Sequence, residues 1–194
     1  MARDANALLN LPNAITLLRF ALVPVLAWQL LQGRADIAFW LFLVSAFSDF
    51  ADGQLARRWH QQSYFGAVAD PLADKLTMAT VTLLLALQGA LPWWFAALLL
   101  LRDLLIVGGA LAYRLVTGAL EMAPSLLSKL NTALQFLLLL ALLAQRGGLL
   151  AAGRWTELLL AATLLTIVAS GLHYVAAWTA RARARQRPAT RAGH

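Results

Sequence analysis

The chain has 194 residues, 61% of them hydrophobic, and carries 16 basic against 9 acidic residues, a net charge of +7, with no cysteine. A soluble domain contains about 45 to 50% apolar residues with glycine included. The composition therefore excludes a water-soluble fold and predicts an integral membrane protein built of helices. The absence of cysteine excludes a disulfide framework, a thiolate nucleophile and a Cys-ligated metal.

Six apolar runs bounded by glycine, proline or charge predict six helices, because each run is long enough to cross a hydrocarbon core about 30 Å thick. The remaining length leaves no room for a separate soluble domain of ordinary size. The predicted fold is an all-α bundle of six transmembrane helices in a single membrane domain, residues 1–180, followed by a basic tail, residues 181–194. The predicted spans are residues 13–32, 36–56, 65–88, 92–113, 125–145 and 155–179.

The basic residues are unevenly divided between the two ends of these spans, and cytoplasmic loops carry the excess of Lys and Arg. One side holds Arg3, Arg57, Arg58, Arg114 and the five arginines of the tail, whereas the other holds Arg34, Arg146 and Arg154. We therefore expect a multi-pass protein of the bacterial inner membrane with both termini in the cytoplasm. The tail is interpreted as a topology determinant, with attraction to anionic lipids as the alternative, and no nucleic-acid partner is expected.

The first twelve residues are less apolar than the predicted span after them, since Leu8, Leu9 and Leu11 lie among Asn and Asp residues. This mixture predicts a short interfacial segment lying on the bilayer. A disordered start is the alternative interpretation.

Four carboxylates lie within or at the ends of the second and third spans: Asp49, Asp52, Asp70 and Asp74. An ionised side chain inside a membrane costs several kcal/mol unless it is paired or bound to a metal, so such residues indicate function. The i, i+3 and i, i+4 spacings place each pair on one face of its helix. Two facing carboxylate pairs predict a dinuclear site, and oxygen ligands without His or Cys favour Mg²⁺, with Mn²⁺ able to substitute.

Two further residues suit a diphosphate beside those ions. Gly53 removes a side chain next to Asp52, so that a ligand can approach the backbone. Arg57, one helical turn further on, offers a fork of donors that matches phosphate oxygens. Together with the metal ions, these residues predict a pyrophosphate site.

The residues Asp49 to Asp74 match the pattern D-x2-D-G-x2-A-R-x8-G-x3-D-x3-D without a gap, which resembles the signature of the CDP-alcohol phosphatidyltransferases. Residues 11–24, LPNAITLLRFALVP, are similar to the first-helix opening of that family. Residues 100–103, LLRD, and 124–135, PSLLSKLNTALQ, resemble its fourth and fifth helices. The resemblance covers most of the chain, and the sixth helix and the tail are unspecific.

The resemblance implies a role for each matching residue. Asp49 and Asp70 would bridge two metal ions, Asp52 would bind one ion, and Asp74 would bind the other and accept a proton. The reaction implied is attack by an acceptor hydroxyl on the phosphatidyl phosphate of CDP-diacylglycerol, with release of CMP. The residues implied to hold CDP-diacylglycerol are Pro12, Asn13, Ala14, Ile15, Gly53, Arg57 and Ser63.

The acceptor should bind beside the metals. Counting along the spans places Arg102 about 17 Å from the cytoplasmic end of the fourth span and Asp74 about 15 Å from the cytoplasmic end of the third. Because these depths agree, Arg102 is a candidate to hold an acceptor phosphate, with Lys129 as a second cation. The alternative is an arginine that only links helices through an aspartate. The segment around Asn131 is most similar to cardiolipin synthases, whose acceptor is phosphatidylglycerol. Phosphatidylglycerophosphate synthases, which use glycerol 3-phosphate, more often have a second lysine at that position.

Two other classes of protein use intramembrane aspartates. A membrane prenyltransferase has two separated Asp-rich motifs on a longer bundle, whereas this chain has one contiguous block. A divalent-cation transporter is disfavoured by Arg57, because a cation beside a conducting site opposes conduction. Membrane lipids are expected neighbours, and the sequence leaves the acceptor, the acyl-chain preference and the oligomeric state open, although dimers are common in the family.

Overall fold

The computed structural model describes residues 11–59, 64–117, 126–151 and 153–185, and the side chains of 17–48, 72–106, 108, 126–151 and 153–171. This part of the chain is all-helical, with no strand. Its helices are α2 (Leu11–Leu31), α3 (Ala35–Trp59), α4 (Tyr64–Leu87), α5 (Trp93–Thr117), α6 (Leu126–Arg146) and α7 (Arg154–Arg185). The predicted interfacial segment lies mostly outside the described residues.

The helices agree with the predicted spans to within a few residues, and the main differences are extensions at charged ends. The second predicted span ends at residue 56, where the apolar run ends, but α3 continues past Arg57 to Trp59. In the same way, α7 continues past residue 179 to Arg185. Arginine and alanine are good helix formers, so the backbone stays helical where hydropathy falls. The start of the basic tail is therefore helical.

Three short turns join the helices at one end of the bundle, and a glycine with positive φ ends the helix before each turn. These glycines are Gly33, Gly89 and Gly148, with φ of 75°, 71° and 70°. After each of them the next amide donates to the carbonyl five residues back, at 2.9 Å for Arg34 to Gln29, 2.9 Å for Ala90 to Leu85 and 2.8 Å for Leu149 to Ala144. This is the Schellman cap, which favours glycine because a left-handed residue with a Cβ is strained.

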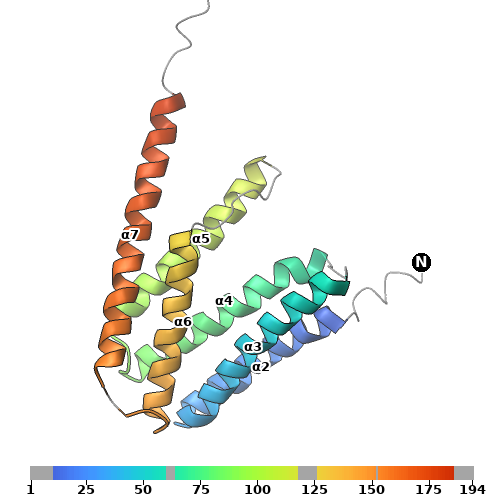
Figure 1. The fold of residues 1–194 in the computed structure, drawn as a ribbon, viewed down its shortest axis with the longest axis vertical. Helices are drawn as coiled ribbons and strands as arrows, with labels where there is room; N and C mark the ends of the chain where they lie inside the picture. Colours follow the sequence, from blue (N-terminus) through green and yellow to red (C-terminus); the bar gives the residue numbers. More distant parts are fainter. Residues whose placement is uncertain (1–10, 60–63, 118–125, 152, 186–194) are drawn as a thin grey trace, which may run out of the picture.

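The described helices include two groups that meet at these turns. Figure 1 shows α2, α3 and α4 running together in one direction, and α6 and α7, which contact each other, running in another. The ends of the two groups opposite the short turns therefore diverge. Side chains tie the turns together, since the Gln88 amide donates to the Leu30 carbonyl at 2.6 Å and Arg146 donates to the Gln88 carbonyl at 3.1 Å.

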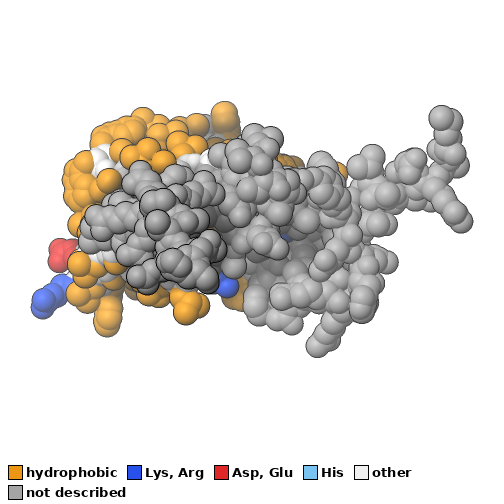
Figure 2. Space-filling model, turned by 90° about the horizontal axis from the view of Figure 1, so that it is seen from above, with side chains coloured by type: hydrophobic (Ala, Val, Ile, Leu, Met, Phe, Trp, Pro, Cys, Tyr) orange, Lys and Arg blue, Asp and Glu red, His pale blue; other side chains and the backbone are white. Residues whose placement is uncertain are grey.

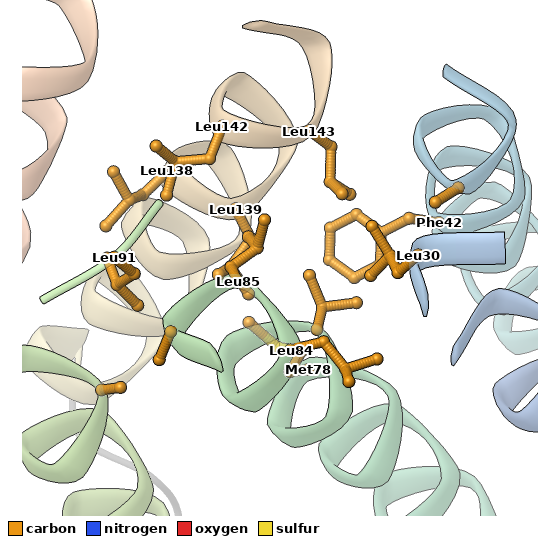
Figure 3. Close-up of a cluster of buried hydrophobic side chains, with 14 of the residues drawn as sticks. Leu30, Phe42, Met78, Leu84, Leu85, Leu91, Leu138, Leu139, Leu142 and Leu143 are labelled. Carbon is orange, nitrogen blue, oxygen red and sulfur yellow. The ribbon is translucent and has the colours of Figure 1, made fainter. Parts of the chain in front are cut away.

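The apolar core of the described residues lies in the half of the bundle near the short turns. Figure 3 shows Leu139 of α6 next to Leu85 of α4, and Leu143 of α6 on the side of Phe42 of α3 and Leu30 of α2. The ring of Phe42 also stacks on Phe136 at 4.9 Å between centroids. Helices α2 to α6 therefore share one core at this end, and this packing fixes the directions in which they run toward the opposite end.

The outer surface is rich in large apolar side chains, as expected for helices that face lipid. Leu104, Leu105 and Leu165 are 69%, 67% and 70% exposed, and Figure 2 shows that the described part of one face is mostly hydrophobic. Among the described residues, only α6 is both long and apolar enough to cross a membrane by length and hydropathy, and Leu17–Leu31 and Ala35–Ser48 are shorter apolar segments. Six crossings stay a prediction.

The α6–α7 turn is packed against the start of α3 so closely that Gly147 cannot carry a side chain without movement. A Cβ on Gly147 would lie 2.6 Å from the backbone nitrogen of Asp36. We expect Gly147→Ala to lower the free energy of unfolding by about 1–3 kcal/mol, the usual cost of overpacking, measured by thermal unfolding in detergent. Gly171→Ala on α7 is the control, because its Cβ would meet nothing within 4 Å; equal stability of the two variants would contradict the packing.

Candidate active site

Beyond the apolar core, every described helix carries a buried polar side chain on the side away from the short turns. Buried polar groups cost free energy unless they are paired, and inside a membrane protein they indicate function. These residues, which we call the polar layer, are Arg19 of α2, Ser45 of α3, Thr77 of α4, Arg102 and Asp103 of α5, Ser128, Asn131 and Gln135 of α6, and Ser170 of α7.

The predicted metal ligands lie on α3 and α4 beside this layer. The two helices run in opposite directions and contact each other. At 1.5 Å per residue, Asp52 lies about 10 Å before the end of α3 and Asp70 about 9 Å after the start of α4, while Asp49 and Asp74 each lie about 15 Å from those ends. By this count the backbone positions of Asp52 and Asp70, and those of Asp49 and Asp74, lie at similar distances from the end of α3 and the start of α4.

The donor set fits a hard divalent cation, because two helices that contact each other carry four carboxylate residues, at two matching distances from the helix ends. The side chains of Asp49, Asp52 and Asp70 lie outside the described ones. Among the described side chains, no group of three or more His, Cys, Asp or Glu residues forms a metal site. Asp74 is half-buried and makes an interaction within the protein.

The predicted nucleotide-binding residues come from the same end of the bundle. The run Pro12, Asn13, Ala14 and Ile15 forms the first turn of α2, and α2 contacts both α3 and α4. Gly53 and Arg57 lie in the last two turns of α3. Their side chains lie outside the described ones, and Ser63 lies outside the described residues altogether.

Arg102 is 8% exposed and joins α5 to α6. One terminal nitrogen, Nη1, donates to Asp103 Oδ1 at 2.8 Å and to Thr132 Oγ1 at 3.3 Å. The other, Nη2, donates to the carbonyl and the hydroxyl of Ser128 at 2.9 and 2.8 Å. Its Nε is buried and makes no hydrogen bond with the described residues. The guanidinium thus links α5 to α6 through Ser128 and Thr132, while its aspartate partner lies on its own helix. Binding an acceptor phosphate through Nη1 or Nη2 would require sharing these bonds.

Lys129 directly follows Ser128, so its backbone lies beside the segment that Arg102 holds, whereas its side chain is exposed. Asn131, two residues further on, is fully buried and its Oδ1 accepts from Thr166 of α7 at 2.8 Å. The structure therefore brings Arg102 and the start of α6 together and places neutral Asn131 inside the polar layer.

Sequence reasoning missed Lys75 and Gln135 as members of this cluster. Lys75 Nζ pairs with Asp103 Oδ1 at 2.7 Å, and Gln135 Nε2 donates to Asp103 Oδ2 at 3.4 Å. The available signal was Lys75 itself, because a lysine inside an apolar span requires a partner of opposite charge. The sequence did not identify which helix supplies that partner.

These features agree with the comparisons with known proteins. Residues 9–181 match the CDP-alcohol phosphatidyltransferase family, and the chain belongs to this family. It is 41% identical over 106 residues to a Mycobacterium tuberculosis protein named provisionally as a cardiolipin synthase, covering 53% of this chain and 50% of that protein. It is 32% identical to a Drosophila melanogaster protein named provisionally as a CMP-forming cardiolipin synthase, covering 89% of this chain and 58% of that protein.

A third relative carries a different name. The chain is 35% identical over 175 residues to a Mycobacterium tuberculosis protein named provisionally as a phosphatidylglycerophosphate synthase, covering 86% of this chain and 80% of that protein. The chain thus spans about half the length of the first curated relatives it matches and most of this one. The names of the relatives divide between two acceptor alcohols.

Proposed function

We propose that this protein transfers a phosphatidyl group from CDP-diacylglycerol to the hydroxyl of an acceptor alcohol and releases CMP, a step of phospholipid synthesis. The observation that carries the proposal is the family match over residues 9–181, and it is supported by the positions of the four aspartates along α3 and α4. A cation transporter and a prenyltransferase are disfavoured by the same match.

The family uses a divalent metal, and we propose two Mg²⁺ ions held by Asp49, Asp52, Asp70 and Asp74, with Mn²⁺ as a substitute. When bound, such ions neutralise a diphosphate and stabilise charge that develops on the leaving phosphate. Pro12, Asn13, Ala14 and Ile15 with Gly53, Arg57 and Ser63 would hold the cytidine nucleotide. Gly53 allows close approach of the diphosphate, and the Arg57 fork suits its oxygens.

In the transfer, the acceptor oxygen forms a bond to the phosphatidyl phosphorus, and the bond from that phosphorus to the CMP oxygen breaks. CMP leaves with the electron pair of the broken bond. Asp74 would take the proton of the acceptor hydroxyl, since its carboxylate lies on the α4 face shared with Asp70 and at the depth of the polar layer. The half-buried position of Asp74 supports this assignment.

The favoured acceptor is phosphatidylglycerol, which makes the proposed product cardiolipin. A phosphomonoester carries close to two negative charges and gains from an extra cation, whereas a phosphodiester carries one. Neutral Asn131, buried in the polar layer and bonded to Thr166, supplies no such cation at its own position on α6. Glycerol 3-phosphate is the second candidate, favoured by the relative that this chain matches over 80% of its length.

Purified protein incubated with Mg²⁺, CDP-diacylglycerol and each acceptor separately tests both parts of the proposal. CMP release with cardiolipin as product supports the favoured acceptor, and phosphatidylglycerophosphate as product supports the second. A protein that releases no CMP with either acceptor would contradict the proposed reaction. A transporter would move divalent cations into vesicles without releasing CMP.

We also propose six membrane crossings with both termini cytoplasmic, a membrane domain of residues 1–180 and a cytoplasmic tail of residues 181–194. The diverging ends of the bundle would then face the cytoplasm, because Arg57, Arg58 and Arg114 lie there, while the short turns with Arg34, Arg146 and Arg154 would face outward. In a bacterial cell the membrane would be the inner one, and a homodimer is the oligomer suggested by the family.

A reporter enzyme fused after His194 checks this topology. We expect activity from a reporter that works only in the cytoplasm and none from a reporter that works only outside, because the Arg excess holds the tail inside. A fusion within the turn at residues 147–153 is the control and should give the reverse pattern. Activity of the external reporter after His194 would show that the orientation is wrong.

A further inference from the structure

One carboxylate in the polar layer, that of Asp103, is shared by three helices. Lys75 of α4 and Arg102 of α5 both donate to Oδ1, at 2.7 and 2.8 Å, and Gln135 of α6 donates to Oδ2 at 3.4 Å. The side chains of Lys75, Arg102 and Asp103 are 22%, 9% and 10% exposed. Asp103 is thus the charged centre of a mostly buried cluster.

The two cations of this cluster are close together because of Asp103. Both nitrogens contact the same oxygen, so they can be no farther apart than the two distances combined, 5.5 Å. Two like charges at that separation, screened by little water, repel each other unless a negative charge lies between them. Neutralising Asp103 would therefore push Lys75 and Arg102 apart and separate the helices that carry them.

The contacts continue from Asp103 to the segment proposed to bind the acceptor. Arg102 holds the carbonyl and hydroxyl of Ser128, and Lys129 is the next residue. On the α4 side of this series of contacts, Lys75 directly follows Asp74, and the Cα atoms of the two residues are about 3.8 Å apart. The links Lys75 to Asp103 to Arg102 to Ser128 thus run from the proposed proton acceptor on α4 to the start of α6.

We propose that Asp103 is a positioning residue for the transfer, which holds the α4 backbone at Asp74 in register with Arg102 and the start of α6. This inference rests on the proposed function. The cluster joins α4, α5 and α6, whereas the residues proposed to contact the cytidine nucleotide directly lie on α2 and α3, apart from Ser63, and α4 contributes metal ligands. Loss of Asp103 should therefore raise the KM for the acceptor alcohol and leave the KM for CDP-diacylglycerol nearly unchanged.

The test is steady-state kinetics of CMP release with each substrate varied in turn. Asp103→Asn keeps the shape of the side chain but removes its charge. We expect its KM for the acceptor to rise about 10- to 100-fold, the scale typical of residues that orient the groups in direct contact with a ligand. The KM for CDP-diacylglycerol should stay within about twofold. Lys75→Met should also raise the KM for the acceptor and not that for CDP-diacylglycerol, but by a smaller factor. Lys75→Arg keeps a cation, so its KM for the acceptor should be close to that of the wild-type protein.

Two variants separate positioning from a merely structural role. A less stable enzyme has fewer active molecules, which lowers the apparent kcat but not KM. Gln145→Leu removes the 3.2 Å bond to Thr156 between α6 and α7 at the opposite end of the bundle, and it should lower the melting temperature with both KM values unchanged. Lys75→Met with Asp103→Asn restores the net charge of the cluster without the link, so it should regain stability but keep the raised acceptor KM.

The outcomes are distinct. A normal acceptor KM in Asp103→Asn, or in the double variant, would overturn the positioning role and leave Asp103 as a structural ion-pair partner. A parallel rise of both KM values would overturn it too, because the effect would then not be confined to the acceptor. A wild-type protein that releases no CMP with any acceptor would overturn the proposed function, and the inference with it.

Discussion

Asp49→Ala or Asp70→Ala is expected to abolish CMP release, with a fall in kcat/KM of at least about a thousandfold. Each change removes a carboxylate proposed to hold the metal ions, and metal stabilisation of the transferring phosphate contributes several kcal/mol, with about 1.4 kcal/mol for each factor of ten in rate. An excess of chelator should have the same effect on the wild-type protein. Activity is measured as CMP released from CDP-diacylglycerol at saturating acceptor.

Asp36→Ala is the matched control for this experiment. Asp36 is a carboxylate on the same helix, α3, but it is exposed and lies in the first turn at the opposite end of the bundle. It should retain nearly full activity. Turnover that persists in excess chelator would contradict the metal assignment, and an Asp36→Ala variant as inactive as Asp49→Ala would show that any loss of charge on α3 inactivates the protein.

Asp74→Asn is expected to lower kcat by about 10²- to 10⁴-fold, the range of a lost general base, with a much smaller effect on the binding of CDP-diacylglycerol. An amide keeps the shape of the side chain but cannot take the proton of the acceptor hydroxyl. Asp52→Asn changes a ligand that is proposed only to bind one ion, so it should act through metal affinity. Raising Mg²⁺ or supplying Mn²⁺ should restore much of the activity of Asp52→Asn.

The comparison uses two isosteric changes on adjacent helices, so each serves as the control for the other. The readouts are kcat as a function of metal concentration and the affinity for CDP-diacylglycerol. If high metal rescues Asp74→Asn as fully as Asp52→Asn, then Asp74 is only a metal ligand and another residue accepts the proton.

The helices themselves could be predicted from local sequence. Apolar runs of membrane-crossing length and the glycines at residues 33, 89 and 148 place the helix ends to within a few residues, because hydrogen bonding within a helix and the left-handed cap after it depend on neighbouring residues. The family could be predicted for the same reason, since its motif lies within 26 consecutive residues, and the match over residues 9–181 confirms it. The roles of the four aspartates stay predictions.

The connections between helices could be predicted only in part. Counting along the spans indicated that Arg102 lies at the depth of Asp74, and the Lys75–Asp103 ion pair confirms that α4 and α5 meet at that level. Counting did not indicate that Ser128, Thr132 and Asp103 occupy both terminal nitrogens of Arg102. Those partners depend on which helix faces bury one another, which the spacing along a single helix does not determine.

The sequence by itself therefore determined the helical composition of the chain, the ends of its helices and the grouping of carboxylates on α3 and α4, because these depend on residues within a few turns of one another. Only the tertiary structure decided that Lys75, Arg102 and Gln135 converge on Asp103, residues separated by up to 60 positions in the chain. A buried charge requires a partner, but many distant residues could supply it, and packing of the apolar core selects the one that does.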